Sequence, residues 1–513
     1  MFRRWIPLVL GIAAIAARGA EPPKAPVAGA TASMDRRLAE LRKSPPELFA
    51  FLYKMPKGGD LHNHLSGAIY AENFLAAAAE QHLCVDKATL ALTPAPPLDA
   101  SDRRGPCPSG QVDAAQTRTD NALRNDLIDS FSMRNFVPGR QSPHDHFFDT
   151  FDKFGAAGSG DLLAEVVRRA GEQNESYLEL MALSGGGPIS DLGKMAGLPG
   201  GSNADFEATR AKLEAAGLAR LVTGLRGRVD QMEQTRLSDL NCADSPGSAA
   251  CRVEVRYVYQ VLREFPKEQV FAQVLAGFAL ANSDSRVVAV NFVQPEDGYN
   301  SMTDYHLHMT MVDYAHRLYP NVHITLHAGE LTLGLVPPEG LRFHIREAVE
   351  LGHAERIGHG VDIMYEKDPD ALMADMRARQ ILVEINLTSN DVILGVKGDE
   401  HPFTVYRKRG VPVALSTDDE GVSRIELTRE FQRAVLTYNL TYSDLKEMIR
   451  NSLEYSFAPG ASYWTDRTYR RVVTPCAAGK KTSACRDYLE KNNKASLEAD
   501  LEDRFGMFER DVR

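Results

Sequence analysis

Histidines and carboxylates stand in four short clusters along this chain, and these residue types bind metals or move protons. In chain order the clusters hold His62 and His64, then His327 and Glu330, then His359, and finally Asp418 and Asp419. Three imidazoles and one carboxylate make a donor set that suits Zn²⁺ and leaves a position open for water. A set of four is far more specific than any single cluster, so we interpret His62, His64, His327 and Asp418 as metal ligands.

The other three residues of these clusters have chemistry of their own. Glu330 follows His327 by three residues, with Gly329 between them. Its carboxyl is therefore expected close to the metal but outside the ligand set, where it can shuttle a proton. His359 has a glycine on each side and is suited to hold or deprotonate a water molecule. Asp419 either faces the site from a strand end or caps the following helix, and both interpretations stay open.

Two further groups of residues are interpreted as structural. His306 and His308 repeat the His-x-His pattern, but they fall near the start of a predicted helix and are expected on its surface. Phe147, Phe148 and Phe154 are candidates for lining an aromatic pocket, yet the pattern favours the core face of a helix.

The clusters lie at the ends of short apolar segments that predict buried strands. Eight such segments occur, at 60–64, 176–181, 253–259, 287–293, 322–327, 356–359, 381–386 and 411–418. Helical patterns separate most of them, for example at 305–318, 341–351 and 369–379. Strands that alternate with helices predict a parallel sheet of the α/β class, and eight of them match a closed (β/α)8 TIM barrel. Such barrels build their active sites at the C-terminal ends of the strands.

The barrel is expected to occupy residues 55–435, with further segments before and after it. Residues 21–54 predict a linker and an N-terminal helix. Stretches rich in Pro and Gly mark two insertions, at about 88–130 and 185–250, which we interpret as extended loops and not as separate domains. Residues 436–513 predict a C-terminal helical cap.

The composition narrows the class of protein. The 513 residues include 43% hydrophobic and 25% charged residues, with a formal net charge of −10. These ordinary globular proportions exclude a mainly disordered or fibrous chain. An acidic chain without a long basic run is poorly suited to bind nucleic acid or an anionic membrane, so a small or neutral substrate is expected.

Residues 1–20 have the features of a secretory signal peptide. Arg3 and Arg4 precede a short apolar run from Ile6 to Ala17, and small residues follow. The run is short for a membrane span, although an uncleaved anchor is the alternative. We therefore expect a secreted or periplasmic protein with no stable membrane association once the signal is removed.

The six cysteines form three pairs that are close in sequence: Cys84 and Cys107, Cys242 and Cys251, and Cys476 and Cys485. No Cys-x-x-Cys motif occurs, which argues against a zinc knuckle or a redox site. In an oxidising compartment these pairs predict three local disulfides, with free thiols as the alternative.

The clusters and their flanking residues resemble the adenosine deaminase family of the amidohydrolase superfamily. The likeness is greatest to its extracellular, signal-bearing branch, which is similar to the adenosine deaminase-related growth factors. Five segments between residue 55 and about residue 435 carry it: Met55–His64, Leu326–Glu330, Glu355–Gly360, Glu384–Asn390 and His401–Asp419.

The resemblance implies a (β/α)8 barrel with one Zn²⁺ per chain on the four ligands named above. It implies that Glu330 protonates the purine ring at N1, and that His359 and Asp419 position and activate the water that attacks C6. The reaction would convert adenosine, or a closely related aminopurine nucleoside, to inosine and ammonia. Because attack at C6 moves electron density onto N1, Glu330 must be protonated when substrate binds, which predicts a raised pKa.

Three positions depart from the family pattern. Ser66 stands where the family often has an acidic residue that meets the ribose 5′-hydroxyl. Gln294 stands where the family usually has a glycine whose backbone N–H meets the purine, and Glu420 replaces a usual proline. We assign Ser66 and Gln294 to substrate binding, and the preferred nucleoside stays open.

Two other functions fit a barrel of this kind. Another hydrolase of the superfamily, acting on an amide, lactone or phosphoester, often uses two metals bridged by a Lys on strand four, and residues 287–297 contain no Lys. A secreted, non-catalytic binding protein would be expected to lack at least one of the seven cluster residues, and all seven are present. A purine nucleoside is thus the expected partner, while a homodimer is neither indicated nor excluded.

Overall fold

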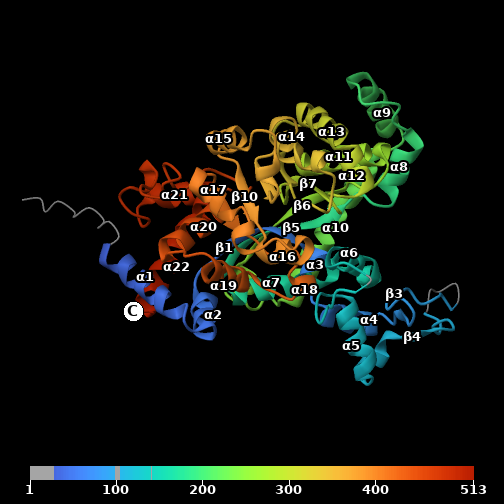
Figure 1. The fold of residues 1–513 in the computed structure, drawn as a ribbon, viewed down its shortest axis with the longest axis horizontal. Coiled ribbons are helices and arrows are strands. Elements are labelled where there is room, and N and C mark those ends of the chain that lie inside the picture. The colour runs from blue at the N-terminus through green and yellow to red at the C-terminus, as the bar shows by residue number, and fades with distance from the viewer. Residues whose placement is uncertain (1–27, 99–103, 140, 513) are drawn as a thin grey trace, which may run out of the picture.

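Eight parallel strands form one sheet at the centre of the protein (Figure 1). The computed structural model describes residues 28–98, 104–139 and 141–512, so the signal peptide predicted for residues 1–20 lies outside the described residues. The sheet follows the chain order β1 (Gly58–His64), β5 (Glu175–Ser184), β6 (Glu254–Leu262), β7 (Val287–Val293), β8 (His323–Ala328), β9 (Arg356–His359), β10 (Leu382–Ile385) and β11 (Val413–Leu415). The predicted (β/α)8 barrel is confirmed.

The first strand and the segment after the last strand meet through backbone hydrogen bonds. The N–H of Asp418 donates to the C=O of His62 at 2.9 Å, and the N–H of His64 donates to the C=O of Asp418 at 3.1 Å. Asn63 and Asp418 accordingly form a parallel bridge. The sheet therefore closes at the residues that the sequence predicts to bind a metal.

Helices follow most strands and cover the outside of the sheet (Figure 1). The covering helices are α7 (Leu163–Glu172), α11 (Lys267–Ser283), α13 (Tyr305–Leu318), α14 (His344–Glu350), α15 (Pro369–Arg379), α17 (Phe403–Arg409) and α20 (Tyr442–Glu454). Strands such as β7 and β10 are buried along their whole length, as expected for parallel strands covered on both faces. The helices predicted at 305–318 and 369–379 have those bounds, and the one predicted at 341–351 begins at His344.

Four short helices begin at or near the C-terminal ends of strands. They are α3 (Leu65–Ala68), α12 (Tyr299–Thr303), α16 (Leu387–Leu394) and α18 (Glu420–Ser423). Because these ends are where barrel enzymes assemble their active sites, the short helices bring additional side chains to the same rim.

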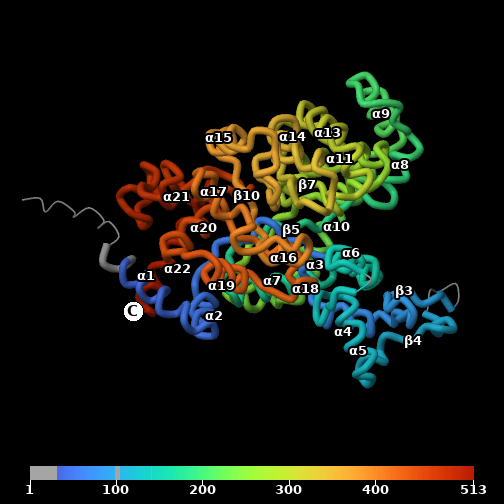
Figure 2. The backbone as a smooth tube through the Cα atoms, viewed as in Figure 1, coloured from blue at the N-terminus to red at the C-terminus, as the bar shows by residue number. Residues whose placement is uncertain are grey.

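The two longest connections extend the barrel on one side (Figure 2). Between β1 and β5 lie α4 (Ala71–Glu80), β2 (Cys84–Asp86), β3 (Leu92–Thr93), β4 (Gln111–Asp113), α5 (Asn121–Ser130) and α6 (Pro143–Phe154). The three short strands among them form a separate antiparallel sheet. Between β5 and β6 lie α8 (Pro188–Ala196), α9 (Asn203–Ala215) and α10 (Leu218–Asp239), of which α8 and α10 pack against α11.

Helices from the two ends of the chain pack together beside the barrel, on its left in Figure 1. They are α1 (Ala28–Leu41), α2 (Pro45–Lys54), α19 (Leu427–Thr437), α21 (Ser483–Lys491) and α22 (Asn493–Asp511). The ring of Phe51 lies 5.1 Å from that of Phe508, and the N–H of Tyr442 donates to Asp35 Oδ1 at 2.8 Å. In the part of the chain that the structure describes, no helix combines the length and apolarity needed to cross a membrane.

Three disulfides join the cysteine pairs that are close in sequence: Cys84–Cys107, Cys242–Cys251 and Cys476–Cys485. The first ties β2 to the segment between β3 and β4, and the second lies in the segment between α10 and β6. The third fastens the start of α21, where both sulfur-bearing residues are buried. These bonds stabilise connections outside the barrel.

We expect the purified, unreduced protein to remain unlabelled by iodoacetamide after denaturation, and to gain six labels after reduction. Replacement of both Cys476 and Cys485 by Ser should lower the free energy of unfolding by about 2–3 kcal/mol, because the open chain gains conformational freedom. Mass spectrometry and thermal denaturation check these outcomes. Six labels without reduction would contradict the pairing.

Candidate metal and proton-transfer site

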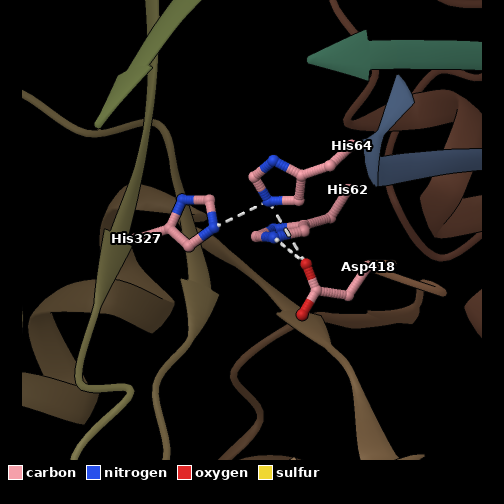
Figure 3. Close-up of side chains that lie close together, drawn as sticks. All are labelled: His62, His64, His327 and Asp418. Atoms are coloured by element: carbon pink, nitrogen blue, oxygen red, sulfur yellow. Dashed lines mark hydrogen bonds and ion pairs between the residues drawn. The ribbon is translucent and has the colours of Figure 1, made fainter. Parts of the chain in front are cut away.

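Four side chains from three places in the chain converge at the C-terminal end of the barrel (Figure 3). His62 and His64 come from β1, His327 from β8, and Asp418 from the segment after β11. The Nε2 atom of His64 lies 3.1 Å from Nε2 of His327 and 3.2 Å from Oδ1 of Asp418. Nε2 of His62 lies 3.3 Å from the same oxygen. The structure brings together the four residues that the sequence predicts as ligands.

The spacing and the electrostatics of these atoms fit a bound cation. Ligand atoms of a tetrahedral zinc ion, at about 2.0–2.1 Å from the metal, stand roughly 3.4 Å apart, close to the separations above. Burial by itself lowers the pKa of His62, but Asp418 and Glu384 raise it to about 10. Burial, together with positive charge on His62 and His64, lowers the pKa of His327 well below its usual value. The site thus stabilises positive charge and keeps His327 as a neutral lone-pair donor.

A buried series of hydrogen-bonded, charged side chains orients His62 from the interior of the barrel. Glu384 Oε2 accepts a hydrogen bond from Nδ1 of His62 at 2.7 Å, which directs Nε2 toward the site. Arg356 Nε donates to the other oxygen of Glu384 at 2.6 Å, and Arg356 Nη2 donates to Glu179 at 2.5 Å. All of these side chains are buried. Carboxylates that hold a metal-binding histidine in this way fix its tautomer and raise its basicity.

Each of the other ligands also has a polar partner. Asn291 Oδ1 accepts hydrogen bonds from both the backbone N–H and Nδ1 of His327, at 2.9 and 3.0 Å. Gln260 Oε1 lies 3.2 Å from Nδ1 of His64. Ser389 donates to Oδ2 of Asp418 at 2.6 Å, leaving Oδ1 for the histidine nitrogens. Every ligand therefore presents one defined atom to the centre.

Glu330 reaches the site by way of a tight turn at Gly329, whose φ is +78°. A Cβ on Gly329 would lie 2.5 Å from Asp362 Oδ1, so only glycine fits there. Glu330 Oε1 lies 3.4 Å from Nδ1 of His359. Burial raises the pKa of Glu330 well above its usual value, and the charges of Asp418 and Glu296 act in the same direction. The raised pKa that the sequence predicts is thus found, and it favours the protonated form of the carboxyl.

His359 lies close to the ligands, and its backbone is in a strained conformation with φ at +69°. Its Nδ1 accepts a hydrogen bond from the side-chain amide of Asn390 at 2.9 Å, while its Nε2 lies 4.0 Å from Asp418 Oδ2. Burial lowers the pKa of His359 to about 3, so the imidazole is neutral. Strained residues of this kind concentrate at functional sites.

Asp419 stands at the start of α18, but its side chain makes no capping hydrogen bond to that helix. Its Oδ1 is buried and has no partner among the described residues. A Cβ at Gly67 would lie only 1.6 Å from this oxygen, so the glycine makes room for the carboxylate. Burial, followed by the charge of Asp418, raises the pKa of Asp419 well above its usual value. Of the two interpretations left open by the sequence, the geometry favours the site over the helix cap.

The site opens into a cavity of about 470 Å³. The lining includes ligands, both candidate proton-transfer carboxylates, and both predicted substrate-binding residues: His64, Ser66, Phe147, Phe148, Phe151, Ser184, Gln260, Gln294, His327, Glu330, Asp418 and Asp419. Asp149 and Asp152 of α6 complete it on the exposed side. Neither Lys nor Arg appears among the described residues that line the cavity.

Gln294 occupies a backbone conformation that favours glycine, with φ at +84°. Its side-chain Oε1 accepts from the N–H of Glu264 at 3.0 Å, and its carbonyl accepts from Arg263 at 2.9 Å. The side chain is therefore tied to the preceding connection. The glycine of the family is replaced here by a residue that keeps the glycine-like backbone.

Two structural interpretations of the sequence hold only in part. Phe147 and Phe154 are buried in the core, as the pattern predicts, and Phe154 stacks on Phe74 at 4.5 Å. Phe147, together with Phe148, also lines the cavity. His308 is buried, with its ring 5.6 Å from that of Phe292 on β7, and burial lowers its pKa to about 3. Only His306 of that pair lies on the helix surface.

The residues that support the ligands carry a signal in the sequence that was not assigned a role above. Asn291 and Glu384 interrupt the apolar strands β7 and β10, and Arg356 begins the short strand β9. A buried polar side chain needs a partner, so each one marks a functional or structural interaction. Glu296 is a further case and lies just after β7.

Comparisons with known proteins support the family resemblance. Residues 231–463 match the family model described as adenosine deaminase. Adenosine deaminase of Clostridium perfringens is 38% identical over 135 residues, which cover 26% of this chain and 37% of that protein. Adenosine deaminase of Shewanella halifaxensis is 30% identical over 208 residues, which cover 40% of this chain and 57% of that protein. The chain thus matches about a third to just over half the length of these curated relatives.

A solved structure, Arabidopsis ADAL complexed with IMP, shares the fold with a TM-score of 0.51 and 18% sequence identity. The alignment covers 89% of this chain and 99% of that one. The family match and the two curated relatives support the predicted likeness to the adenosine deaminase family. The extracellular branch stays a prediction.

We expect Glu384→Gln to weaken Zn²⁺ binding by about 10–100-fold, because an amide cannot hold Nδ1–H of His62 and Arg356 Nε–H as a carboxylate does. Chelator competition followed by elemental analysis measures the affinity. Glu498→Gln is a matched control, since Glu498 is a buried carboxyl in α22, remote from the ligands. Equal zinc affinity in the wild type and in Glu384→Gln would contradict the role of this buried series of side chains.

Proposed function

We propose that this protein, with its match to the adenosine deaminase family, is a zinc-dependent deaminase of adenosine or a closely related aminopurine nucleoside. The products are inosine, or the corresponding 6-oxopurine nucleoside, and ammonia. The observation that carries the proposal is one cavity lined by His64, His327, Asp418 and the buried carboxyl of Glu330, with His62 completing the ligand set. A metal site next to a neutral carboxylic acid suits water attack on a ring carbon that has a basic nitrogen beside it.

His62, His64, His327 and Asp418 would hold the zinc ion. A bound Zn²⁺ lowers the pKa of water from 15.7 to about 7, which supplies the nucleophile at neutral pH. Asn291, Glu384 and Ser389 hold three of these ligands in place. The positions of the ligands then depend little on the substrate.

Glu330 acts on the ring nitrogen N1. Because its carboxyl is neutral, it donates a hydrogen bond to N1 and transfers the proton as electron density moves there during attack at C6. An ionised carboxylate at the same place would repel the N1 lone pair. Burial among Asp418 and Glu296 is what keeps the proton on Glu330.

His359 and Asp419 flank the place where water approaches C6. The neutral His359 presents Nε2, and Asp419 presents Oδ1, and neither atom has a hydrogen-bond partner among the described residues. Because Nδ1 of His359 accepts from Asn390, its Nε2 carries the ring proton and can donate to the attacking water, while Oδ1 of Asp419 can accept a hydrogen bond from that water. Both side chains are therefore suited to orient the water. Gly67 leaves room for the Asp419 carboxylate, and Asn390 holds the His359 ring through a hydrogen bond.

The cavity lining favours a neutral, aromatic substrate over a phosphorylated one. Phe147, Phe148 and Phe151 offer apolar faces to a purine, and Ser66 and Gln294 offer polar groups at the other walls. The carboxylates of Asp149 and Asp152 would repel a 5′-phosphate, and the described lining has no cation to offset them. We therefore place nucleosides ahead of nucleotides.

We further propose that the protein is exported, with one zinc ion per chain. Three disulfides in a chain with no free cysteine among the described residues suit an oxidising compartment. The predicted signal peptide leads to the same proposal. The following test distinguishes the proposed deaminase from the two alternatives, another hydrolase of the superfamily and a non-catalytic binding protein.

We expect purified mature protein to lower the ultraviolet absorbance of adenosine as inosine forms, and a chelator to abolish the change. Glu330→Gln should lower kcat by about 10²–10⁴-fold with zinc retained, because the amide cannot transfer a proton to N1. Adenosine 5′-monophosphate should react much more slowly than adenosine. Full zinc loading without turnover of any aminopurine would contradict the proposed reaction.

A further inference from the structure

A fully buried carboxylate, Glu296, binds the backbone of the turn that carries Glu330. Its Oε1 accepts a hydrogen bond from the N–H of Gly329 at 3.0 Å, and its Oε2 accepts one from the N–H of Glu330 at 2.8 Å. Glu296 lies in the connection after β7, whereas the turn follows β8. One side chain therefore links the ends of two neighbouring strands.

A histidine holds Glu296 from the opposite side. Nδ1 of His344, the first residue of α14, donates to Glu296 Oε1 at 2.6 Å. The imidazole stacks on the ring of Tyr305 at 3.7 Å, and the hydroxyl of Tyr305 donates to the carbonyl of His344 at 2.8 Å. His344 has no freedom to turn away, so the Glu296 carboxylate is fixed at both oxygens.

The carbonyl side of the same turn is also fixed. The N–H groups of Val361 and Asp362 donate to the carbonyl of Gly329 at 2.8 and 3.2 Å. With Glu296 on the N–H side and residues 361–362 on the C=O side, the peptide before Glu330 has a single orientation.

The carboxyl of Glu330 itself has no comparable support. Among the described residues, its buried Oε1 has no hydrogen-bond partner and lies 3.4 Å from Nδ1 of His359. A group that must stay free to donate its proton cannot be held through its own oxygens. Its direction therefore depends on the backbone from which it projects.

We propose that Glu296 is a positioning residue that, supported by His344, fixes the backbone amides of Gly329 and Glu330 and so aims the Glu330 carboxyl at the substrate. The role rests on the proposed function of Glu330 as proton donor. A shift of the donor by about 1 Å can cost on the order of 100-fold in rate, because proton transfer requires close alignment.

The test compares Glu296→Gln with Glu366→Gln. Glu366 is also a buried carboxyl that accepts a backbone N–H, from Arg346 at 3.0 Å, but it does not hydrogen-bond to the Glu330 turn. We expect Glu296→Gln to lower kcat by about 10–100-fold, with KM within about threefold and zinc content unchanged. Glu366→Gln should leave kcat within about twofold of the wild type.

A second pair of variants tests the same support through His344. His344→Asn keeps a side-chain N–H near the position of Nδ1 and should retain most of kcat, while His344→Leu removes the donor and should lower kcat as Glu296→Gln does. Binding of an inhibitor with a tetrahedral carbon in place of C6 should weaken in parallel with kcat/KM. If Glu296 and His344 had a purely structural role, the variants would lower the melting temperature, but inhibitor binding would not weaken in parallel with kcat/KM.

Hydrogen exchange provides a readout independent of turnover. The amides of Gly329 and Glu330 should exchange slowly in the wild type, faster in Glu296→Gln, and at the wild-type rate in Glu366→Gln. An inactive wild type would refute the proposed function, and exchange would still decide whether Glu296 holds the turn. The positioning role is overturned if Glu296→Gln keeps kcat within threefold at full zinc loading, or if its exchange is unchanged.

Discussion

The structure depends on one constraint: the barrel closes through the same residues that face its site. The backbone of Asp418 pairs with that of His62 and His64, so the first and last strands are joined where their side chains converge. Any change in the closure of the sheet would move at least three donor atoms at once. A change in the register of the sheet would therefore also change the geometry of the site.

Buried charge makes this arrangement costly unless it is compensated. His62, Glu384, Arg356 and Glu179 form a continuous hydrogen-bonded chain through the barrel interior, and isolated buried charges of this kind would be strongly destabilising. Among the described residues, several buried polar atoms without hydrogen-bond partners lie at the site, including Nε2 of His359, Oε1 of Glu330 and Oδ1 of Asp419. These atoms are available to a ligand that binds there.

Much of this was predictable from the sequence because the strands are short apolar segments with polar ends. The eight strands and the convergence of His62, His64, His327 and Asp418 follow from that pattern and from the rule that barrel sites form at the C-terminal ends. The helical period at His308 could not reveal that Phe292 of β7 packs against this position. In the same way, the period at Phe148 did not show that one face of α6 borders the cavity.

The supporting residues were harder to find for a different reason. Arg356 and Glu384 are 28 positions apart and Glu296 and His344 are 48 apart, so their pairing depends on which strands are neighbours. The direction of the Gln294 side chain likewise depends on the N–H of Glu264. Local patterns identify residue types and elements, whereas contacts between elements require the folded sheet.

The central claim is that these converging donors hold a metal ion in the catalytic cavity. Anomalous diffraction at the zinc absorption edge, from crystals of zinc-loaded protein, tests it most directly. The account predicts one strong peak between Nε2 of His62, His64 and His327 and Oδ1 of Asp418. A zinc peak elsewhere with none at this position, or no peak in protein that carries zinc, would contradict it.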